Sequence, residues 1–349
     1  MILIYFQDES HSIKNPKAKA TEAALKLGKI ARRVILVSGT PALSRPLELF
    51  PQLLILDNTF AKFREFTLRY CEGVQASYGW NANGCCNLTE LNVILKKKFM
   101  IRRIKSEVHK ELGEKMREIV KLENLDLNVN SQNHMSEFAS QFQRSSGRDT
   151  DKILLLWYQS TAEIKAKAVC LYVEKLLKEK VKFLLFAHHR VMLDAVSSCL
   201  DRLGVNYMRI DGSTRSEIRT INVNRFQENE ECRVAVLSLK ACNSGITLTA
   251  ASMVVFAELD WNPSIINQAE ARAHRIGQTQ TVRVVFLLAP KTADDQIWYK
   301  LNEKQKTLEK VGLCAQNEHF AGNKNKTEFS ASAASSTVSS SRLNHPFYL

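Results

Sequence analysis

Phe183-Leu184-Leu185-Phe186-Ala187 is a short apolar run that begins after a charged segment and stops at His188-His189. Apolar residues at every position are typical of a strand buried on both faces of a parallel sheet. Further short apolar runs follow at regular intervals. The runs that we expect to be strands are Tyr207 to Ile210, Val234 to Leu237, Val254 to Ala257 and Val282 to Leu288.

Helical patterns alternate with these runs. The expected helices are Lys165 to Lys180, Val191 to Leu203, Arg215 to Gln227, a short helix after Asn262, and Ala293 to Val311. This alternation predicts an α/β fold, with a parallel sheet covered by helices on both faces. The loops after the strands, at His188-His189, Asp211 to Ser213 and Ser238 to Gly245, should then open at one edge of the sheet.

The helix expected after Asn262-Pro263 carries two arginines. Asparagine suits the N-cap, proline suits the first helical position, and Gly277 suits a left-handed C-terminal residue. Gln268, Arg272 and Arg275 are spaced i, i+4 and i+7, so they should share one face. Two guanidinium groups on one face suit an anionic ligand such as a transferring phosphoryl group, although a basic, solvated helix explains the same spacing.

A second parallel sheet is expected near the N-terminus. Ile2 to Phe6 and Val34 to Val37 are apolar runs typical of buried strands. Asp8-Glu9 follows the first run, where one carboxylate could hold Mg²⁺ through water and the other could activate a water molecule. Ser38-Gly39-Thr40-Pro41 follows the second run and suits either a phosphate contact or a tight turn. A solvent-exposed turn is the alternative for Asp8-Glu9.

The length of 349 residues, 45% of them hydrophobic, is sufficient for two domains. We predict an incomplete first lobe with a helical insertion over residues 1–110, a linker with a second helical insertion over 111–160, a second lobe over 161–315 and a disordered, serine-rich tail over 316–349.

The net charge of +13 favours a polyanionic partner. Eight cysteines without paired C-x-x-C motifs indicate reduced thiols of an intracellular protein. The apolar N-terminal run is too short for a membrane span and has no basic flank, so we expect neither a signal peptide nor a membrane partner.

Six motifs occur in a characteristic order. They are Asp8 to His11, Ser38 to Pro41, Met100 to Lys105, Ile210 to Thr214, Asp260 to Pro263 and Gln268 to Gln278. This series resembles that of the Swi/Snf-type, helicase-like ATPases of superfamily two, and the resemblance covers about residues 1 to 315. Within that group the sequence is most similar to the HepA-related annealing helicases, with the zinc-finger annealing helicases as the alternative. The segments that carry this closer similarity include Phe186 to His189, Ala241 to Thr247, Val255 to Leu259 and Thr292 to Asp295.

The resemblance implies two RecA-like lobes, the first incomplete, with ATP and Mg²⁺ as cofactors. Asp8 would coordinate the magnesium ion through water, and Glu9 would activate the attacking water. His11, Ser38, Gly39 and Thr40 would couple the nucleotide to DNA. Arg272 and Arg275 would act as arginine fingers, with Gly245 and Gln268 shaping the same seam. The expected DNA contacts are Arg102, Arg103 and Lys105, for which a solvated basic edge is the alternative.

The implied function is that of an ATP-dependent DNA translocase or annealing helicase, which rewinds DNA and remodels stalled replication forks in the nucleus. Its expected partners are double-stranded and forked DNA and, through an upstream segment, a single-strand DNA-binding protein. The family's phosphate-binding loop, G-x-x-x-x-G-K-[ST], does not occur in the sequence. We therefore expect a fragment that begins inside the first lobe and is inactive alone. A non-catalytic DNA-binding or adaptor protein is the alternative.

Overall fold

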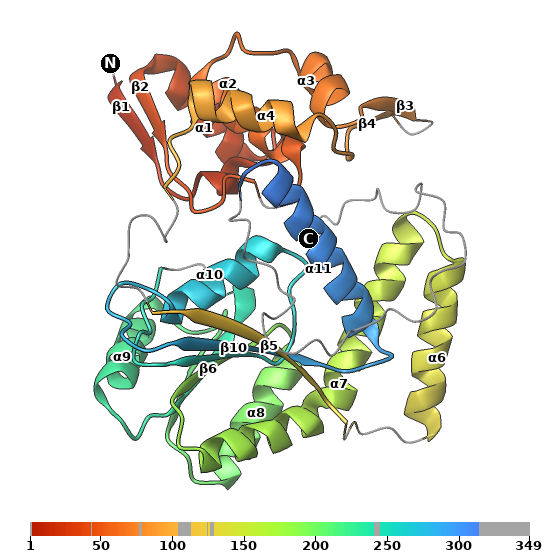
Figure 1. Cartoon of the computed structure of the whole chain (residues 1–349), viewed down its shortest axis with the longest axis vertical. Helices are drawn as coiled ribbons and strands as arrows, with labels where there is room; N and C mark the ends of the chain where they lie inside the picture. Colours follow the sequence, from red (N-terminus) through yellow and green to blue (C-terminus); the bar gives the residue numbers. More distant parts are fainter. Residues whose placement is uncertain are drawn as a thin grey trace.

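The computed structural model describes residues 2–42, 44–76, 79–103, 113–123, 125, 129–240 and 245–313. Two bodies are visible in Figure 1: an N-terminal body of residues 2–103, and a sheet body that contains residues 113–313. Helix α11 (Ala293–Lys310) extends from the second toward the first. The tail predicted to be disordered, 316–349, lies outside the described residues.

The sheet body is built on a six-stranded, all-parallel sheet in the order β5-β10-β9-β6-β8-β7. The strands are β5 (Lys115–Lys121), β6 (Phe183–Ala187), β7 (Tyr207–Ile210), β8 (Val234–Ser238), β9 (Met253–Phe256) and β10 (Val282–Leu288). The α/β class and five of the strands confirm the expectations from the sequence.

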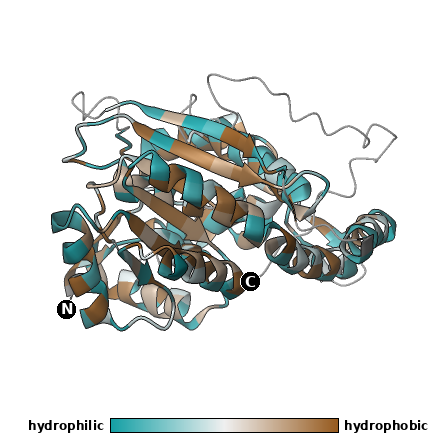
Figure 2. Cartoon of the chain, turned by 90° about the horizontal axis from the view of Figure 1, so that it is seen from below, coloured by the Kyte–Doolittle hydropathy of each residue, from teal (hydrophilic) through white to brown (hydrophobic). Residues whose placement is uncertain are grey.

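Burial explains why these runs form the centre of the sheet. Every residue of β6 is fully buried, and its side chains alternate between two cores on opposite faces of the sheet. On one face Phe186, Phe256 and Phe286 stack side by side across three strands, with ring centroids 5.5 and 5.0 Å apart. Figure 2 shows that the inner strands are hydrophobic, whereas the strand at the edge of the sheet and many helical residues are hydrophilic.

Within the described part of the chain, six helices accompany this sheet. They are α6 (Val129–Arg144), α7 (Arg148–Lys178), α8 (Arg190–Arg202), α9 (Ser216–Glu228), α10 (Pro263–Ala273) and α11. Helix α7 supplies Trp157 and Tyr158 to one core and Val169 and Val173 to the other, so it contributes to both faces. The bounds of α8 and α9 lie within a residue of the expected ones.

The segment 111–160, expected as a linker with a helical insertion, contains a strand and two helices in its described residues. Residues Lys115–Lys121 form the edge strand β5 of the main sheet, and the single helix α7 continues through residue 160. The charges in β5 made it resemble a linker, yet they have partners: Arg283 of β10 binds Glu118 at 2.8 Å. The domain boundaries at 110, 160 and 315 stay predictions.

The N-terminal body contains a two-stranded parallel sheet of β1 (Ile2–Gln7) and β2 (Ala31–Leu36). Its other elements are η1 (Ser10–Ile13), α1 (Lys19–Ile30), η2 (Pro46–Leu49), α2 (Phe50–Leu56), α3 (Phe63–Tyr70), β3 (Val74–Ala76), β4 (Gly79–Asn81), α4 (Leu88–Ile94) and η3 (Leu95–Phe99).

The prediction that both N-terminal strands are buried is wrong for the described residues. Tyr5 and Val34 pack toward α1 and α2, whereas Ile4, Phe6 and Ile35 on the opposite face are exposed. The apolar run predicted that both faces of this sheet are buried, whereas the described residues cover only one face.

Helix α11 completes the core of the N-terminal body. Leu308, with Val311 and Leu313 just beyond the helix, packs in the same cluster as Leu91 and Phe66. The C-terminal end of the sheet body is thereby anchored in the other body (Figure 1). Within the described residues, none of the helices is both long and apolar enough to span a membrane.

Candidate functional site

The acidic turn lies at the carboxyl end of β1. Asp8 is exposed, and its Oδ1 accepts a hydrogen bond from the backbone N–H of Glu9 at 2.8 Å. Glu9 has a left-handed backbone, with φ 46°, and its carboxylate lies 3.2 Å from His11 Nδ1. The same ring nitrogen lies 3.0 Å from Ser38 Oγ. The ends of β1 and β2 thus bring together four of the predicted site residues.

His11 is half-buried, and burial lowers the pKa of its imidazole while Glu9 opposes the shift. Ser38 Oγ also accepts from the backbone N–H of Thr40 at 3.2 Å, across the exposed Gly39. Thr40 Oγ1 is buried without a hydrogen-bond partner in the described structure. The buried hydroxyl of Thr40, beside a glycine turn, can donate to a phosphate. The exposed carboxylate of Asp8 can accept from the waters of a magnesium ion.

Magnesium fits Asp8 in one specific way. Mg²⁺ usually keeps several waters and binds one or two carboxylates plus substrate phosphates, so a single exposed carboxylate is enough protein contribution. Among the described residues, no cluster of three His, Cys, Asp or Glu side chains forms an all-protein metal site. The turn is therefore suited to a metal that arrives with a phosphate.

The arginine helix α10 begins as expected. Asn262 Oδ1 accepts from the backbone N–H of Ser264 at 3.0 Å, and Pro263 occupies the first turn. The helix ends earlier than expected, at Ala273, because His274 leaves the helical conformation and its Nε2 lies 2.7 Å from Gly113 O. Gly277 does have positive φ, at 98°.

Arg275 therefore lies in the turn after α10, and the predicted shared helical face of three residues is wrong. Gln268 and Arg272 remain on the helix, where Gln268 is half-buried.

Arg272 and Arg275 nevertheless converge on the loop that begins at Gly245. Arg272 is 7% exposed, and its Nη1 donates to Ile246 O at 3.4 Å. Arg275 is exposed, and its Nη1 donates to Thr247 Oγ1 at 2.8 Å and to Gly245 O at 3.3 Å. Gly245 adopts φ 58°, which suits glycine. The two arginines and this glycine thus lie together, and their predicted role at a nucleotide seam stays a prediction.

The acidic turn and the arginine site belong to different bodies, and within the described residues neither Asp8 nor Glu9 pairs with Arg275. Charges of both bodies act instead on Asp260, which is 4% exposed. Burial raises its pKa to about 6, against the opposing effects of Lys304, Lys240 and Lys14. Lys14 follows the acidic turn, so the bodies approach each other here.

Lys304 lies at this approach and was not predicted from the sequence as a site residue. It lies on α11, donates from Nζ to Trp261 O at 2.8 Å, and has its pKa lowered to about 8 by burial and by Arg45 of the N-terminal body. The sequence does contain an indication of its burial, because Lys304 lies between the apolar helix positions Leu301 and Leu308.

The loops after β6 and β9 meet, as expected from a parallel sheet. Glu258 is buried; its Oε2 accepts from the backbone N–H groups of His188 and His189, each at 2.8 Å, and its Oε1 lies 2.6 Å from His189 Nδ1. Tyr158 packs edge-on against His189 and donates to Leu259 O. Burial, together with the neighbouring His189, lowers the pKa of His188 to about 4.

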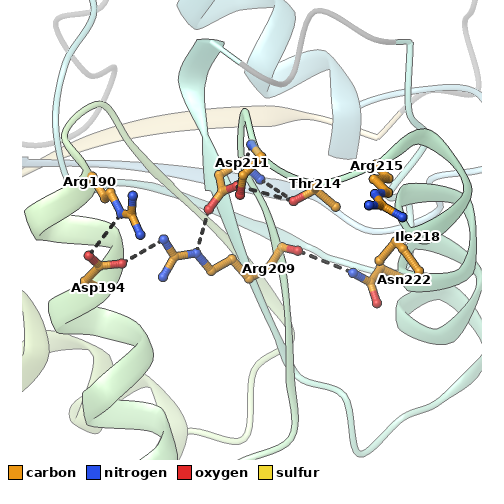
Figure 3. Close-up of a pocket in the computed structure, with 9 residues that line it drawn as sticks. Arg190, Asp194, Arg209, Asp211, Thr214, Arg215, Ile218 and Asn222 are labelled. Carbon is orange, nitrogen blue, oxygen red and sulfur yellow. Dashed lines mark hydrogen bonds and ion pairs between the residues drawn. The ribbon is translucent and has the colours of Figure 1, made fainter.

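A basic hollow of about 520 Å³ opens beside these loops, where β7 ends and α8 and α9 begin (Figure 3). Arg209 is paired with Asp194 at 2.8 Å and with Asp211 at 2.9 Å. Arg190 is exposed and only loosely paired with Asp194, at 3.5 Å. Figure 3 shows Arg215 at the opposite side, with no ion pair to the residues drawn. The hollow thus presents two exposed guanidinium groups.

The basic block predicted to contact DNA is divided in the structure. Arg102 is half-buried and donates to Gly312 O, which holds the end of α11. Arg103 is exposed, and Lys105 lies outside the described residues. Arg102 therefore has a structural role that the sequence did not predict.

Residues 2–169 match the SNF2-related domain family, and residues 165–277 match the helicase conserved C-terminal domain family. A Drosophila melanogaster protein named SWI/SNF-related matrix-associated actin-dependent regulator of chromatin subfamily A-like protein 1 is 55% identical over 312 residues, which cover 89% of this chain and 41% of that protein. Its Xenopus tropicalis namesake is 43% identical over 314 residues, covering 89% and 33%.

The mouse DNA annealing helicase and endonuclease ZRANB3 is 40% identical over 307 residues, which cover 85% of this chain and 29% of that protein. The C-terminal part of the Fun30 ATPase domain aligns with a TM-score of 0.42 and 18% identity, over 53% of this chain and 90% of that one. The chain thus spans less than half the length of these curated relatives. With an SNF2-related domain followed by a helicase C-terminal domain, the chain belongs to the SNF2-related, helicase-like ATPase family.

Proposed function

We propose that this chain forms part of a DNA-dependent ATPase that translocates on double-stranded and forked DNA in the nucleus and rewinds separated strands. The observation that carries the proposal is the arginine site formed by Arg272, Arg275 and Gly245, in a chain 55% identical to a named SWI/SNF-related regulator. Another relative is named as a DNA annealing helicase, which supports rewinding as the outcome.

In this proposal the acidic turn and the arginine site act on one triphosphate. Magnesium held through water by Asp8 would neutralise phosphate charge. Glu9 accepts the proton of the attacking water, and its contact with His11 at 3.2 Å connects this base to Ser38 and the second strand. The fork of Arg275, which is exposed on the turn after α10, stabilises charge on the transferring group once the bodies close.

DNA would be bound through its phosphates. The exposed arginines of the hollow, Arg190 and Arg215, and the exposed Arg103 provide charge without a recognition helix, so we expect salt-sensitive binding that is independent of sequence. A single-strand DNA-binding protein is proposed as a further partner on the family resemblance alone.

The 349 residues contain no G-x-x-x-x-G-K-[ST] loop, so we propose that they hydrolyse no ATP by themselves. The test is a fusion in which the segment of the Drosophila relative that precedes the matched region is joined before Met1. We expect DNA-stimulated hydrolysis that Arg275→Ala lowers by about 10³ to 10⁵-fold. Glu9→Gln should abolish it. Arg202→Ala, a change at an exposed arginine of α8, is the matched control.

Arg275→Lys should rescue the fusion poorly, because a point charge does not replace the planar fork. Hydrolysis by the 349 residues alone, or a fusion indifferent to Arg275→Ala, would refute the assignment. A fusion that binds DNA tightly but never hydrolyses ATP would instead support the alternative, a DNA-binding or adaptor protein, which the basic hollow also favours.

A further inference from the structure

Glu270, in the middle of the arginine helix, is buried among cations of a distant segment. Its side chain is 1% exposed. Arg117 of β5 donates to it twice, from Nε to Oε1 at 2.8 Å and from Nη2 to Oε2 at 2.7 Å. Lys115 Nζ lies 2.8 Å from the same Oε2. Although burial alone raises the pKa of Glu270, the two cations bring it down to about 2, so the carboxylate stays charged.

Helix α10 and the residue that follows it make two further contacts with this segment. Arg117 Nη2 also donates to Asn267 Oδ1 at 2.8 Å, and His274 Nε2 lies 2.7 Å from Gly113 O. Positions 267 and 270 are spaced i and i+3, so they share one face of the helix, and His274 is the first residue after it. These polar contacts attach α10 and its C-terminal end to β5 and to the residues just before it.

The C-terminal end of α10 carries the arginine site. The backbone N–H of Leu248 donates to the carbonyl of Arg272 at 2.9 Å. The backbone N–H of Gln278 donates to the carbonyl of Arg275 at 3.0 Å. The orientation of α10 therefore sets where both arginines and the Gly245 loop lie. None of these contacts is made by β5 itself; β5 reaches them through α10 and through the neighbouring strand β10, which follows Gln278 in the chain.

We propose that Glu270, gripped by Lys115 and Arg117, is the positioning residue of the arginine site: the edge strand β5 fixes the rotation and height of α10, and so the placement of Arg272 and Arg275. A two-pronged guanidinium–carboxylate contact is suited to this task because it fixes geometry as well as distance. The significance for phosphate chemistry rests on the function proposed above, but the positioning itself does not.

Energetics supports a role beyond stability. An apolar cluster of similar volume is often as stable as a buried ion cluster, or more stable, whereas removing one partner is strongly destabilising. The two roles can therefore be separated by experiment. A single substitution disturbs both the stability of the protein and the position of α10. Replacing the whole cluster with apolar residues should restore the stability but not the orientation of α10.

The test is amide hydrogen exchange on the 349-residue chain, which needs neither ATP nor DNA. Glu270→Gln and Arg117→Met should speed exchange at Leu248 and Gln278 by about tenfold or more, while amides inside β6 change by less than about threefold. Arg117→Lys, which keeps the charge but not the fork, should give an intermediate rate. Glu118→Gln is the matched control: Glu118 lies on the other face of β5, and its change should leave Leu248 unaffected.

A triple variant, Lys115→Met with Arg117→Met and Glu270→Leu, covers the case in which single variants fail to fold. Its urea midpoint should return to that of the wild type while exchange at Leu248 stays fast. If exchange at Leu248 returns with the midpoint, or if Glu270→Gln speeds all amides equally, the cluster serves only stability and the proposal is overturned. Absence of ATP hydrolysis in the fusion would leave this result unchanged.

Discussion

Asp260→Asn should stabilise this protein more at neutral pH than at pH 4. The carboxylate is 4% exposed, accepts from the backbone N–H of Asn262 at 2.8 Å, and has a pKa of about 6 instead of its ordinary 3.8. An acid whose pKa is raised by folding binds protons more tightly in the folded state. Its ionisation therefore costs stability as the pH rises.

The size of the effect follows from the two pKa values. Each tenfold change in proton affinity corresponds to about 1.36 kcal/mol, so the shift from 3.8 to about 6 is worth about 3 kcal/mol. The cost is absent well below pH 3.8, grows between pH 3.8 and 6, and is complete near pH 7. Asparagine keeps the acceptor for Asn262 but carries no charge, so the variant avoids this cost.

Urea unfolding followed by circular dichroism, at half-unit intervals from pH 4 to 7, measures the difference between variant and wild type. Lys14, Lys240 and Lys304 are the charges that act on Asp260. Asp211→Asn is the control: hydrogen bonds from Ser213 and the ion pair with Arg209 lower the pKa of Asp211 to about 2, so the contribution of this carboxylate to stability changes below this window. Parallel stability curves for Asp260→Asn and wild type would refute the reasoning.

Lys165→Met should lower the free energy of unfolding by about 3–5 kcal/mol, because it leaves the carboxylate of Asp294 buried without its 2.6 Å partner; adding Asp294→Leu should recover most of the loss in urea titrations. The double change Arg190→Ala with Arg215→Ala should weaken duplex binding equally for all sequences and flatten the log–log salt slope by about 1.8, and a marked sequence preference would contradict it. Leu308→Ala should cost about 2–5 kcal/mol and expose the N-terminal body to proteolysis first, which limited digestion followed by mass spectrometry would detect.

The centre of the sheet body was predictable because its inner strands are buried on both faces. Phe183 to Ala187 contains no polar residue, and the observed β6 has the same bounds. Strand β5 was not predictable from its own residues. Lys115 and Arg117 are ordinary surface residues until Glu270, more than 150 positions later, is placed between them. Pairing at that separation leaves no periodic signal.

The sequence indicated the candidate residues of the arginine site, but not the contacts that hold α10 in place. The N-cap of α10 and the left-handed Gly277 in the turn after the helix were predictable, since Asn262 and Gly277 act through local backbone geometry. The early end of the helix depends on the contact of His274 with Gly113, which no local pattern contains. The same limit applies to Lys304, whose partners lie on other elements.

Helix α10 is held at its start, its middle and its end by contacts of different origin. Lys304 of α11 reaches the residues before its N-cap, Glu270 binds β5, and the Leu248 loop bonds to its last turn. Two of these supports lead to the N-terminal body: α11 ends in the core around Leu308, and β5 begins twelve residues after Arg103 in the chain. We therefore expect a displacement of one body relative to the other to act on α10 through α11, because Leu308 of α11 packs in the N-terminal body while Lys304 of the same helix binds the residue before the N-cap of α10.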